Sequence, residues 1–189
     1  MQEVLLQHVQ DSLEIKRAFF AKEMGRVVAI ANRMADLLEG GGKILVCGNG
    51  GSAADAQHFA TELCCRFETE RRALAAMALT TDTSALTAIG NDYGFDRVFA
   101  RQVEALGRPG DLLVGISTSG NSENVARAAS VAKSMGMGTI GLLGGDGGRL
   151  QSLVEDCLTV PHRVTARIQE VHIMVIHFWC EVLDGRFTC

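Results

Sequence analysis

The sequence is poor in the features that mark secreted, membrane-spanning or nucleic-acid-binding proteins. No apolar run reaches the roughly 18 residues needed to cross a bilayer, and the first residues are amphipathic, without the apolar block of a signal peptide. The 22 acidic residues outnumber the 18 basic ones, giving a net charge of −4, so no basic surface for non-specific nucleic-acid binding is expected. These absences favour a soluble cytoplasmic protein that binds neither membranes nor nucleic acids.

Two further absences narrow the chemistry. The six cysteines include no CxxC pair, and several lie in apolar runs, so most are expected to be small buried residues in a reducing compartment. The GxxxxGK[ST] phosphate-binding pattern and the GxGxxG dinucleotide fingerprint are also missing. A monophosphate therefore suits the chain better than a nucleotide.

Residues 43–63 combine an apolar run, a glycine turn and a helical pattern. The run is bounded by glycines, which is typical of a buried strand. The turn Asn49-Gly50-Gly51-Ser52 lets the backbone approach a ligand closely, because glycine has no side chain. Ser52 is predicted to cap the helix that follows, whose free N–H groups point back at the turn. This arrangement predicts a site for an anion.

Residues 117–122 repeat this arrangement between another predicted strand and helix. Four of the six positions carry hydroxyl groups, in Ser117, Thr118, Ser119 and Ser122. Capping a helix would explain one or two of them, whereas hydroxyl and N–H groups at a helix N-terminus can donate several hydrogen bonds to one phosphate. We expect this turn to bind the phosphate.

The candidate catalytic residues lie on two predicted helices. His58 and Glu62 are four residues apart and share a helix face, where they could hold a metal or act together on a substrate; such a pair is more often a solvated face. The last helix carries Gln169, His172 and His177. The apolar neighbours of His177 predict burial, and a core histidine bonded to a backbone carbonyl is the simpler interpretation of that residue.

Alternating strand and helix patterns predict a mostly parallel sheet with helices on both faces. Ligands of such sheets bind at the carboxyl ends of strands, where both turns lie. Beyond residues 43–63, strands are expected at 75–79, 112–116, 139–143 and 156–160, helices at 84–90, 95–106, 123–135 and 165–183, and a turn at 91–94. Residues 2–39 read as two helices separated at Gly25. The sequence does not decide whether this segment packs on its own domain or on a neighbouring subunit.

Five motifs together resemble the sugar isomerase (SIS) domain, and within it the phosphoheptose isomerase family, also called sedoheptulose 7-phosphate isomerases. They are CGNGGSAADAQHFATEL, AIGNDYGF, GISTSGNS, GGDGG and ARIQEVHIMVIH, and they touch almost the whole chain. The resemblance implies one SIS domain over 1–189: N-terminal helices used in oligomerisation (1–39) and a flavodoxin-like α/β/α core (40–189) with a five-stranded parallel sheet. It also implies a homotetramer with active sites at subunit interfaces.

The resemblance further implies an activity and its residues. The reaction would convert D-sedoheptulose 7-phosphate to D-glycero-D-manno-heptose 7-phosphate through an enediol(ate), the first step towards ADP- or GDP-heptose and lipopolysaccharide. Glu62 and His177 would be catalytic. One zinc ion per subunit would be bound by His58, Glu62, Gln169 and His177. The substrate would contact Asn49, Gly50, Gly51, Ser52, Glu62, Asn91, Asp92, Ser117, Thr118, Ser119, Ser122 and Gln169.

Three tensions accompany this assignment. A carboxylate that is bound to zinc is a poor base. Glu62 would therefore have to dissociate from the metal during turnover, or zinc would mainly organise the site and not take part in the chemistry. Gln169 and His177 are about 12 Å apart along a straight helix, which ranks Gln169 below the other ligands. Some family members carry an acidic residue where this chain has Ala166, so Asp92 or water would have to replace that carboxylate.

Two other functions compete. A related branch of SIS proteins binds the bacterial replication initiator protein as a non-catalytic scaffold, and the stretch RFETER at residues 66–71 resembles that branch. Glu62 argues against it, because that branch lacks the carboxylate. An isomerase of amino-sugar or pentose phosphates is the third possibility, and it would lack the zinc-type quartet.

Overall fold

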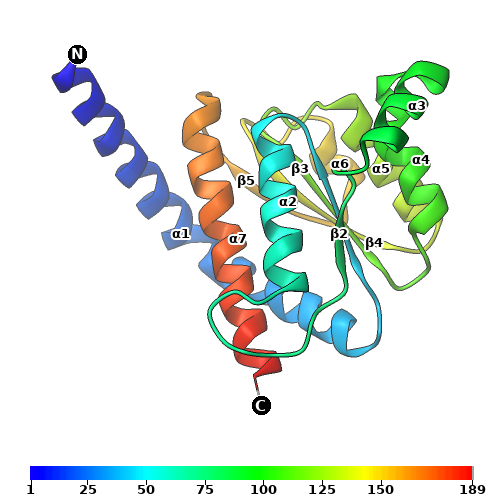
Figure 1. The fold of residues 1–189 in the computed structure, drawn as a ribbon. Helices are drawn as coiled ribbons and strands as arrows, with labels where there is room; N and C mark the ends of the chain where they lie inside the picture. The colour runs from blue at the N-terminus through cyan, green and yellow to red at the C-terminus, as the bar shows by residue number, and fades with distance from the viewer. Residues whose placement is uncertain (189) are drawn as a thin grey trace.

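The computed structural model describes residues 1–188, in which one parallel sheet is covered by helices on both faces (Figure 1). The strands lie in the order β2-β1-β3-β4-β5. Their bounds are β1 (Ile44–Gly48), β2 (Ala76–Ala78), β3 (Leu112–Ser117), β4 (Gly138–Gly144) and β5 (Asp156–Val160). The helices are α1 (Gln2–Glu39), α2 (Gly51–Cys64), α3 (Thr83–Tyr93), α4 (Val98–Leu106), α5 (Glu123–Ser134), α6 (Leu150–Leu153) and α7 (Thr165–Phe187), with a 3₁₀ turn η1 (Phe95–Arg97).

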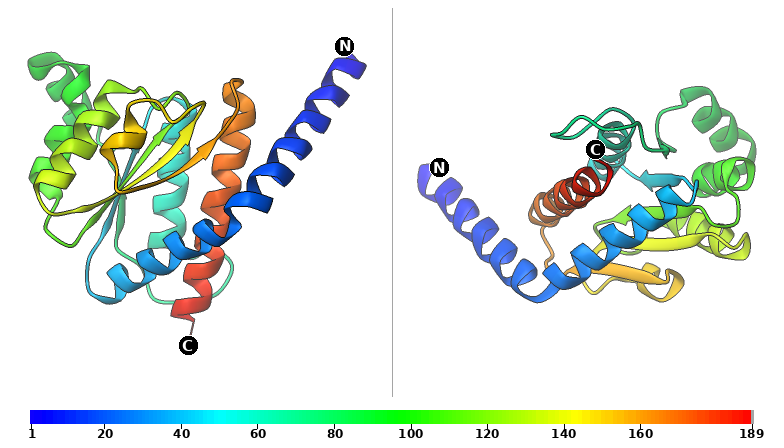
Figure 2. Two further views of the ribbon diagram at one scale, coloured as in Figure 1. Left: turned by 180° about the vertical axis from the view of Figure 1, so that it is seen from behind. Right: turned by 90° about the horizontal axis from the view of Figure 1, so that it is seen from below.

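Alternate strand residues face two separate cores. Ile44 and Val46 pack with α1, α2 and α7, whereas Leu45 and Cys47 pack with α4, α5 and α6 on the other face. The two views of Figure 2 show these helix layers on opposite sides of the sheet. Side chains of a strand alternate between its faces, so a strand that is apolar throughout must be covered on both sides. The predicted three-layer α/β/α sandwich is confirmed.

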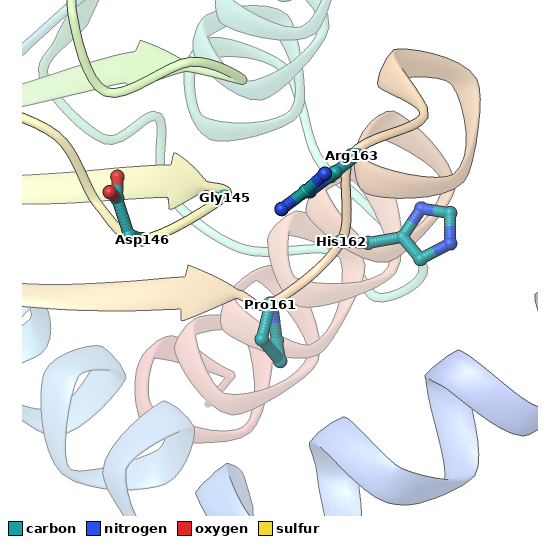
Figure 3. A pocket seen from close by; sticks show the side chains of 5 residues that line it. All are labelled: Gly145, Asp146, Pro161, His162 and Arg163. Carbon is teal, nitrogen blue, oxygen red and sulfur yellow. The ribbon is translucent and has the colours of Figure 1, made fainter.

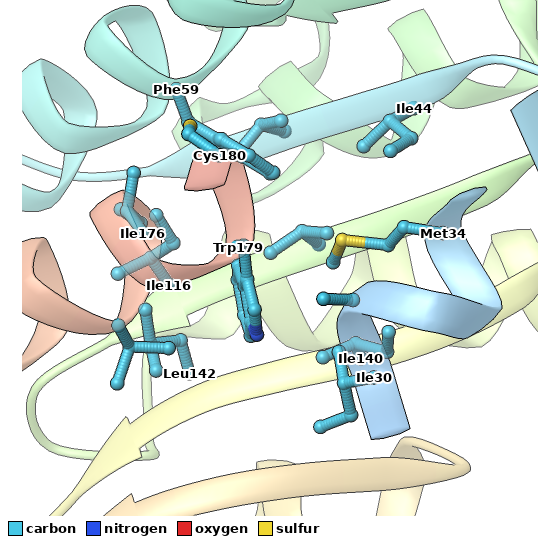
Figure 4. Packing of buried hydrophobic residues seen from close by; sticks show 14 of the residues in the cluster. Ile30, Met34, Ile44, Phe59, Ile116, Ile140, Leu142, Ile176, Trp179 and Cys180 are labelled. Atoms are coloured by element: carbon cyan, nitrogen blue, oxygen red, sulfur yellow. The ribbon is translucent and has the colours of Figure 1, made fainter. Parts of the chain in front are cut away.

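Trp179 of α7 lies at the centre of the first core (Figure 4). It is fully buried, its ring centroid lies 5.7 Å from that of Phe59 in α2, and its Nε1–H donates to the carbonyl of Val27 in α1 at 3.2 Å. Truncation of such a side chain to alanine costs about 3–5 kcal/mol. One residue thus ties together the three helices on this face.

The strand order reverses between β1 and β3. These strands are hydrogen-bonded neighbours, with Gly48 opposite Ile116, although β2 comes between them in the sequence. Their carboxyl ends therefore lie side by side. The chain continues from β1 to β2 at one edge of the sheet, and from β3 to β4 towards the other edge. Such a switch point is where open α/β sheets bind ligands.

The N-terminal segment is a single helix of 38 residues, so the predicted break at Gly25 is wrong. Residues 2–39 contain no proline, and an interior glycine costs only about 1 kcal/mol, which burial of the second half of α1 offsets. The helix bends instead, and its first half stands away from the sheet (Figure 2). That half exposes Val4, Leu5, Leu6, Val9 and Leu13.

Two local predictions were also wrong. Residues 91–93 are the last turn of α3 rather than a loop, and the chain turns only at Gly94, whose φ is +91°. Gly50, not Ser52, is the N-cap of α2, because its φ of +56° turns the chain into the helix two residues earlier. No helix within residues 1–188 is both long and apolar enough to cross a membrane.

Candidate active site

The hydroxyl loop, residues 117–122 after β3, is held by its own side chains. The Oγ atoms of Ser117 and Ser122 are 2.9 Å apart, and the Oγ of Ser119 accepts the N–H of Asn121 at 3.1 Å. Ser122 is the N-cap residue of α5 but makes no side-chain cap hydrogen bond. Its hydroxyl therefore faces the loop rather than the helix, which favours phosphate binding over capping.

A close backbone contact fixes the back of the hydroxyl loop. Gly120 has φ +65°, and a Cβ at this position would lie 2.1 Å from the carbonyl oxygen of Gly147. The Gly120 carbonyl also accepts the N–H of Leu150 at 2.9 Å. Only glycine allows this approach, so the loop after β4 supports the loop after β3.

The glycine loop, residues 49–52 after β1, is joined by a pair of amides to α5, the helix that follows the hydroxyl loop. The Nδ2 of Asn49 donates to the Oδ1 of Asn124 at 2.9 Å, and the reverse bond has the same length. Asn124 is buried at the start of α5. The glycine loop is therefore anchored to the start of the helix that follows the hydroxyl loop, through Asn124, a residue that the sequence did not reveal.

His58, Glu62 and His177, here called the α2–α7 cluster, meet across two helices. The Nε2 of His58 lies 3.3 Å from the Oε1 of Glu62 and 3.4 Å from the Nε2 of His177. The ring of Phe67, from the loop after α2, stacks on His177 with centroids 5.6 Å apart. The cluster is open to solvent in a single chain, since the His58 side chain is 43% exposed and that of Glu62 23%.

The donor set of the α2–α7 cluster suits zinc in kind and in spacing. Two ligand atoms about 2.0–2.2 Å from a tetrahedral Zn²⁺ lie about 3.3–3.6 Å apart, which matches both distances from the His58 Nε2. Within residues 1–188, however, no three His, Cys, Asp or Glu side chains form a closed metal cage. Two of the three donor pairs thus have the spacing of ligands that share a metal, but the three side chains would have to move before they could hold one together.

Gln169 lies elsewhere on α7. A Cβ on Gly51 would lie 2.3 Å from its Nε2, so the Gln169 amide rests on the glycine loop. Gly51 precedes His58 by seven residues, about 10 Å along the axis of α2. The structure therefore places Gln169 with the substrate loops, and its role as a zinc ligand stays a prediction.

Asn91 and Asp92 are not brought to the α2–α7 cluster. They lie on α3 in the other helix layer (Figure 1), where both are exposed and the Nδ2 of Asn91 donates to the Oδ1 of Asp92 at 2.8 Å. Within one chain they face solvent. Their predicted contact with the sugar is untested by this geometry.

His172, rather than His177, is the core histidine of α7. It is fully buried, and its Nε2 lies 2.9 Å from the carbonyl oxygen of Leu143 in β4. Burial lowers the pKa of His172 to about 4, although the Leu143 carbonyl opposes the shift. The ring is therefore neutral near pH 7 and donates this bond.

Asp55 is a polar residue of α2 that sequence reasoning missed. Its Oδ2 is buried and has no hydrogen-bond partner within residues 1–188, and burial raises the pKa of the carboxyl to about 6, an effect that His58 partly offsets. The only sign in the sequence is its position three residues before His58. Asp55 adds a second carboxyl to this face of α2.

A cavity of about 380 Å³ lies at the carboxyl ends of β4 and β5 (Figure 3). Arg163 extends towards Gly145, while His162 points to the other side. The cavity is lined by Gly145, Asp146, Pro161, His162 and Arg163. It shares an edge of the sheet with the substrate loops but contains none of the residues predicted from the sequence.

Comparison with known proteins agrees with the fold described above. Residues 7–144 match the SIS domain family. The chain is 54% identical to the phosphoheptose isomerase of Roseiflexus sp. (strain RS-1), over 95% of this chain and 91% of that one. It is 60% identical to the phosphoheptose isomerase of Geobacter sulfurreducens, over 86% of each chain. The solved phosphoheptose isomerase of Neisseria gonorrhoeae superposes with a TM-score of 0.91 at 53% identity, over 97% of this chain and 98% of that one.

Proposed function

Because the chain belongs to the SIS domain family and, within it, to the phosphoheptose isomerases, we propose that it converts D-sedoheptulose 7-phosphate to D-glycero-D-manno-heptose 7-phosphate. The observation that carries this proposal is the meeting of His58, Glu62 and His177 on α2 and α7, of which α2 begins at the glycine loop of the β1/β3 switch point. A carboxylate and an imidazole are the groups that an aldose–ketose isomerisation needs.

The phosphate group and the reacting carbons would bind at different loops. The hydroxyl loop and the N-terminus of α5 hold the phosphate, and the glycine loop with Gln169 holds the sugar hydroxyls. This leaves C1 and C2 of the sugar at the α2–α7 cluster. Binding energy from the phosphate thereby orients the reacting end.

The reaction needs two proton transfers. Glu62 removes a proton from C1 of the ketose and returns one to C2, while His177 moves a proton between the oxygens on C1 and C2, through an enediol(ate). Zinc bound by His58, Glu62 and His177 would stabilise negative charge on the substrate oxygens as a Lewis acid. Elemental analysis of protein purified without chelator tests this: absence of zinc, with no effect of added zinc on the rate, would contradict it.

We also propose a homotetramer whose subunits complete one another's active sites. Three features support it: the apolar first half of α1 is exposed, the α2–α7 cluster is open to water, and Asn91 and Asp92 face away from it. An enediolate needs shelter from solvent, which a neighbouring chain can provide. Light scattering tests the assembly, and a fully active monomer would contradict it.

The place of the reaction follows from its chemistry. Sugar phosphates are charged and do not cross membranes unaided, so we place the enzyme in the cytoplasm. A heptose 7-phosphate is a precursor of activated heptose for a bacterial surface glycan such as lipopolysaccharide.

Substrate comparison separates this proposal from its competitors. Purified protein should turn over sedoheptulose 7-phosphate and leave amino-sugar 6-phosphates and pentose 5-phosphates unchanged. The initiator-binding scaffold is disfavoured by the presence of Glu62. Binding to the initiator protein without any sugar-phosphate turnover would overturn the proposal in favour of that scaffold.

A further inference from the structure

A buried ion pair between Arg71 and Asp184 adjoins the α2–α7 cluster. Their side chains are 0% and 4% exposed, and the Nε of Arg71 lies 2.7 Å from the Oδ1 of Asp184. Burial raises the pKa of Asp184, but hydrogen bonds from the Thr69 and Glu68 N–H groups and from Arg71 outweigh burial and hold that pKa below its usual range. The pair is thus charged at neutral pH. A buried pair is weak evidence for a stabilising role, which leaves its purpose open.

Arg71 binds the turn of α2 that carries Glu62. Its Nη2 donates to the carbonyl of Glu62 at 2.7 Å, and its Nη1 donates to the carbonyl of Leu63 at 3.0 Å. These carbonyls belong to the last turn of the helix, where no intrahelical donor is available. The guanidinium also complements the negative end of the helix dipole. Arg71 therefore fixes the backbone from which Glu62 projects.

Asp184 binds α7 to the loop that packs on His177. It follows His177 by seven residues, so both lie on one face of α7. Its Oδ2 accepts the N–H groups of Glu68 and Thr69 at 2.8 and 2.9 Å. Phe67, the preceding residue of that loop, stacks on the His177 ring. Asp184 therefore fixes the loop whose Phe67 ring packs against His177.

We propose that Arg71 and Asp184 are positioning residues for the isomerisation. Together they fix α2 against α7, and thereby the distance of the His177 imidazole from His58 and Glu62 on α2. Neither touches the substrate in this account, which rests on the proposed isomerase function. A misplacement of reacting groups by about 1 Å can cost about 100-fold in rate.

The chain contains a matched control in the turn before β3, outside α2 and α7. Asp111 is also buried; it accepts the backbone N–H groups of Lys43 and Arg108 at 3.0 and 2.8 Å and pairs with the Lys43 ammonium. It precedes β3, whereas the active site follows β3. Asp111→Asn thus removes the same kind of interaction as Asp184→Asn, but the bonds that it breaks, to Lys43 and Arg108, involve neither α2 nor α7.

The test compares Asp184→Asn with Asp111→Asn by thermal unfolding and by steady-state kinetics on sedoheptulose 7-phosphate. Both variants should lower Tm. Only Asp184→Asn should lower kcat, by about 10- to 100-fold, with KM within about threefold of wild type. Arg71→Lys, which keeps the charge but loses the guanidinium fork, should retain more activity than Arg71→Gln. An unchanged kcat in Asp184→Asn, or in Arg71→Lys and Arg71→Gln if Asp184→Asn does not fold, would overturn the proposal.

A structural readout separates this inference from the proposed function. Crystal structures of wild type and Asp184→Asn should show the His58–His177 Nε2 separation widening from 3.4 Å. If wild-type protein has no isomerase activity, the proposed function fails, and this separation alone decides the positioning role. An unchanged separation in the variant would then refute it.

Discussion

The hydroxyl loop and the α2–α7 cluster are two halves of one site that are built in opposite ways. The hydroxyl loop is made by six consecutive residues, and its hydroxyl contacts link members of that stretch. The cluster joins side chains 119 positions apart. A local loop is fixed by the strand and helix on either side, whereas a contact between helices depends on the packing of the whole layer.

This difference predicts a division of labour. The hydroxyl loop rests on backbone contacts with the neighbouring strand connection at Gly120 and Gly147, so changes there should affect binding. The cluster contains the only pair of proton-transfer groups in our mechanism, so changes there should affect chemistry. Variants in each half should therefore affect different kinetic constants.

The largest effect is expected from Glu62→Gln. An amide cannot accept the carbon-bound proton, so kcat should fall about 10³-fold or more, while the oligomer and Tm stay as in wild type. Steady-state kinetics with light scattering checks this. Glu181→Gln, on the exposed face of α7, is the control. Wild-type turnover in Glu62→Gln would remove that residue from the mechanism.

The next effect is expected from the double variant Ser119→Ala, Ser122→Ala. Each hydroxyl lost to a charged phosphate costs about 1.5–3 kcal/mol, so KM should rise about 100-fold or more, with a smaller change in kcat. Ser130→Ala, in the body of α5 where the hydroxyl bonds a helix carbonyl, is the control. If KM stays the same, these hydroxyls only shape the turn.

A smaller effect should distinguish the roles of Gln169 and His58. Gln169→Ala removes an amide that lies against Gly51, so KM should rise by about fivefold to tenfold while bound zinc is retained. His58→Ala should lose zinc. Metal analysis beside kinetics checks both variants. Loss of zinc from Gln169→Ala would instead assign this residue to the metal.

The smallest effect on the site is expected from His172, which belongs to neither half. Its folded pKa of about 4 lies below the ordinary 6.5, so the unfolded chain binds the extra proton first. Above pH 6.5 the ring is neutral in both states and the free energy of unfolding is unaffected by it. As the pH drops from 6.5 towards 4, the free energy of unfolding falls by about 3 kcal/mol at most, because only the unfolded chain takes up the proton. His172→Gln, which can still donate to Leu143, should flatten this pH dependence in urea unfolding. Identical pH profiles would contradict the assignment.

The same contrast explains what the sequence could and could not reveal. The strand at 156–160 and the two turns at 49–52 and 117–122 follow from local patterns, because apolar runs and glycine turns carry their own geometry. The continuity of α1 through Gly25 does not, since it depends on packing against α7. The helical end of α3 at Tyr93 was likewise hidden by residues that usually form turns.

Residues that act through distant partners were also invisible. The pairing of His58 with Glu62 follows from helical spacing, but the approach of His177 is a tertiary contact that the sequence only suggested through family resemblance. Asn124, Asp55 and Arg71 look like ordinary polar residues until their partners are known. Their roles depend on which distant residues the fold brings next to them, and no short motif encodes such contacts.

One measurement tests the central claim most directly: proton NMR of the purified protein with D-sedoheptulose 7-phosphate in D₂O. The account predicts formation of the aldose 7-phosphate, with deuterium at C2 delivered by a base that exchanges with solvent. The Glu62→Gln variant should form no product over the same time. A wild-type protein that leaves the ketose unchanged, with or without added zinc, would contradict the account.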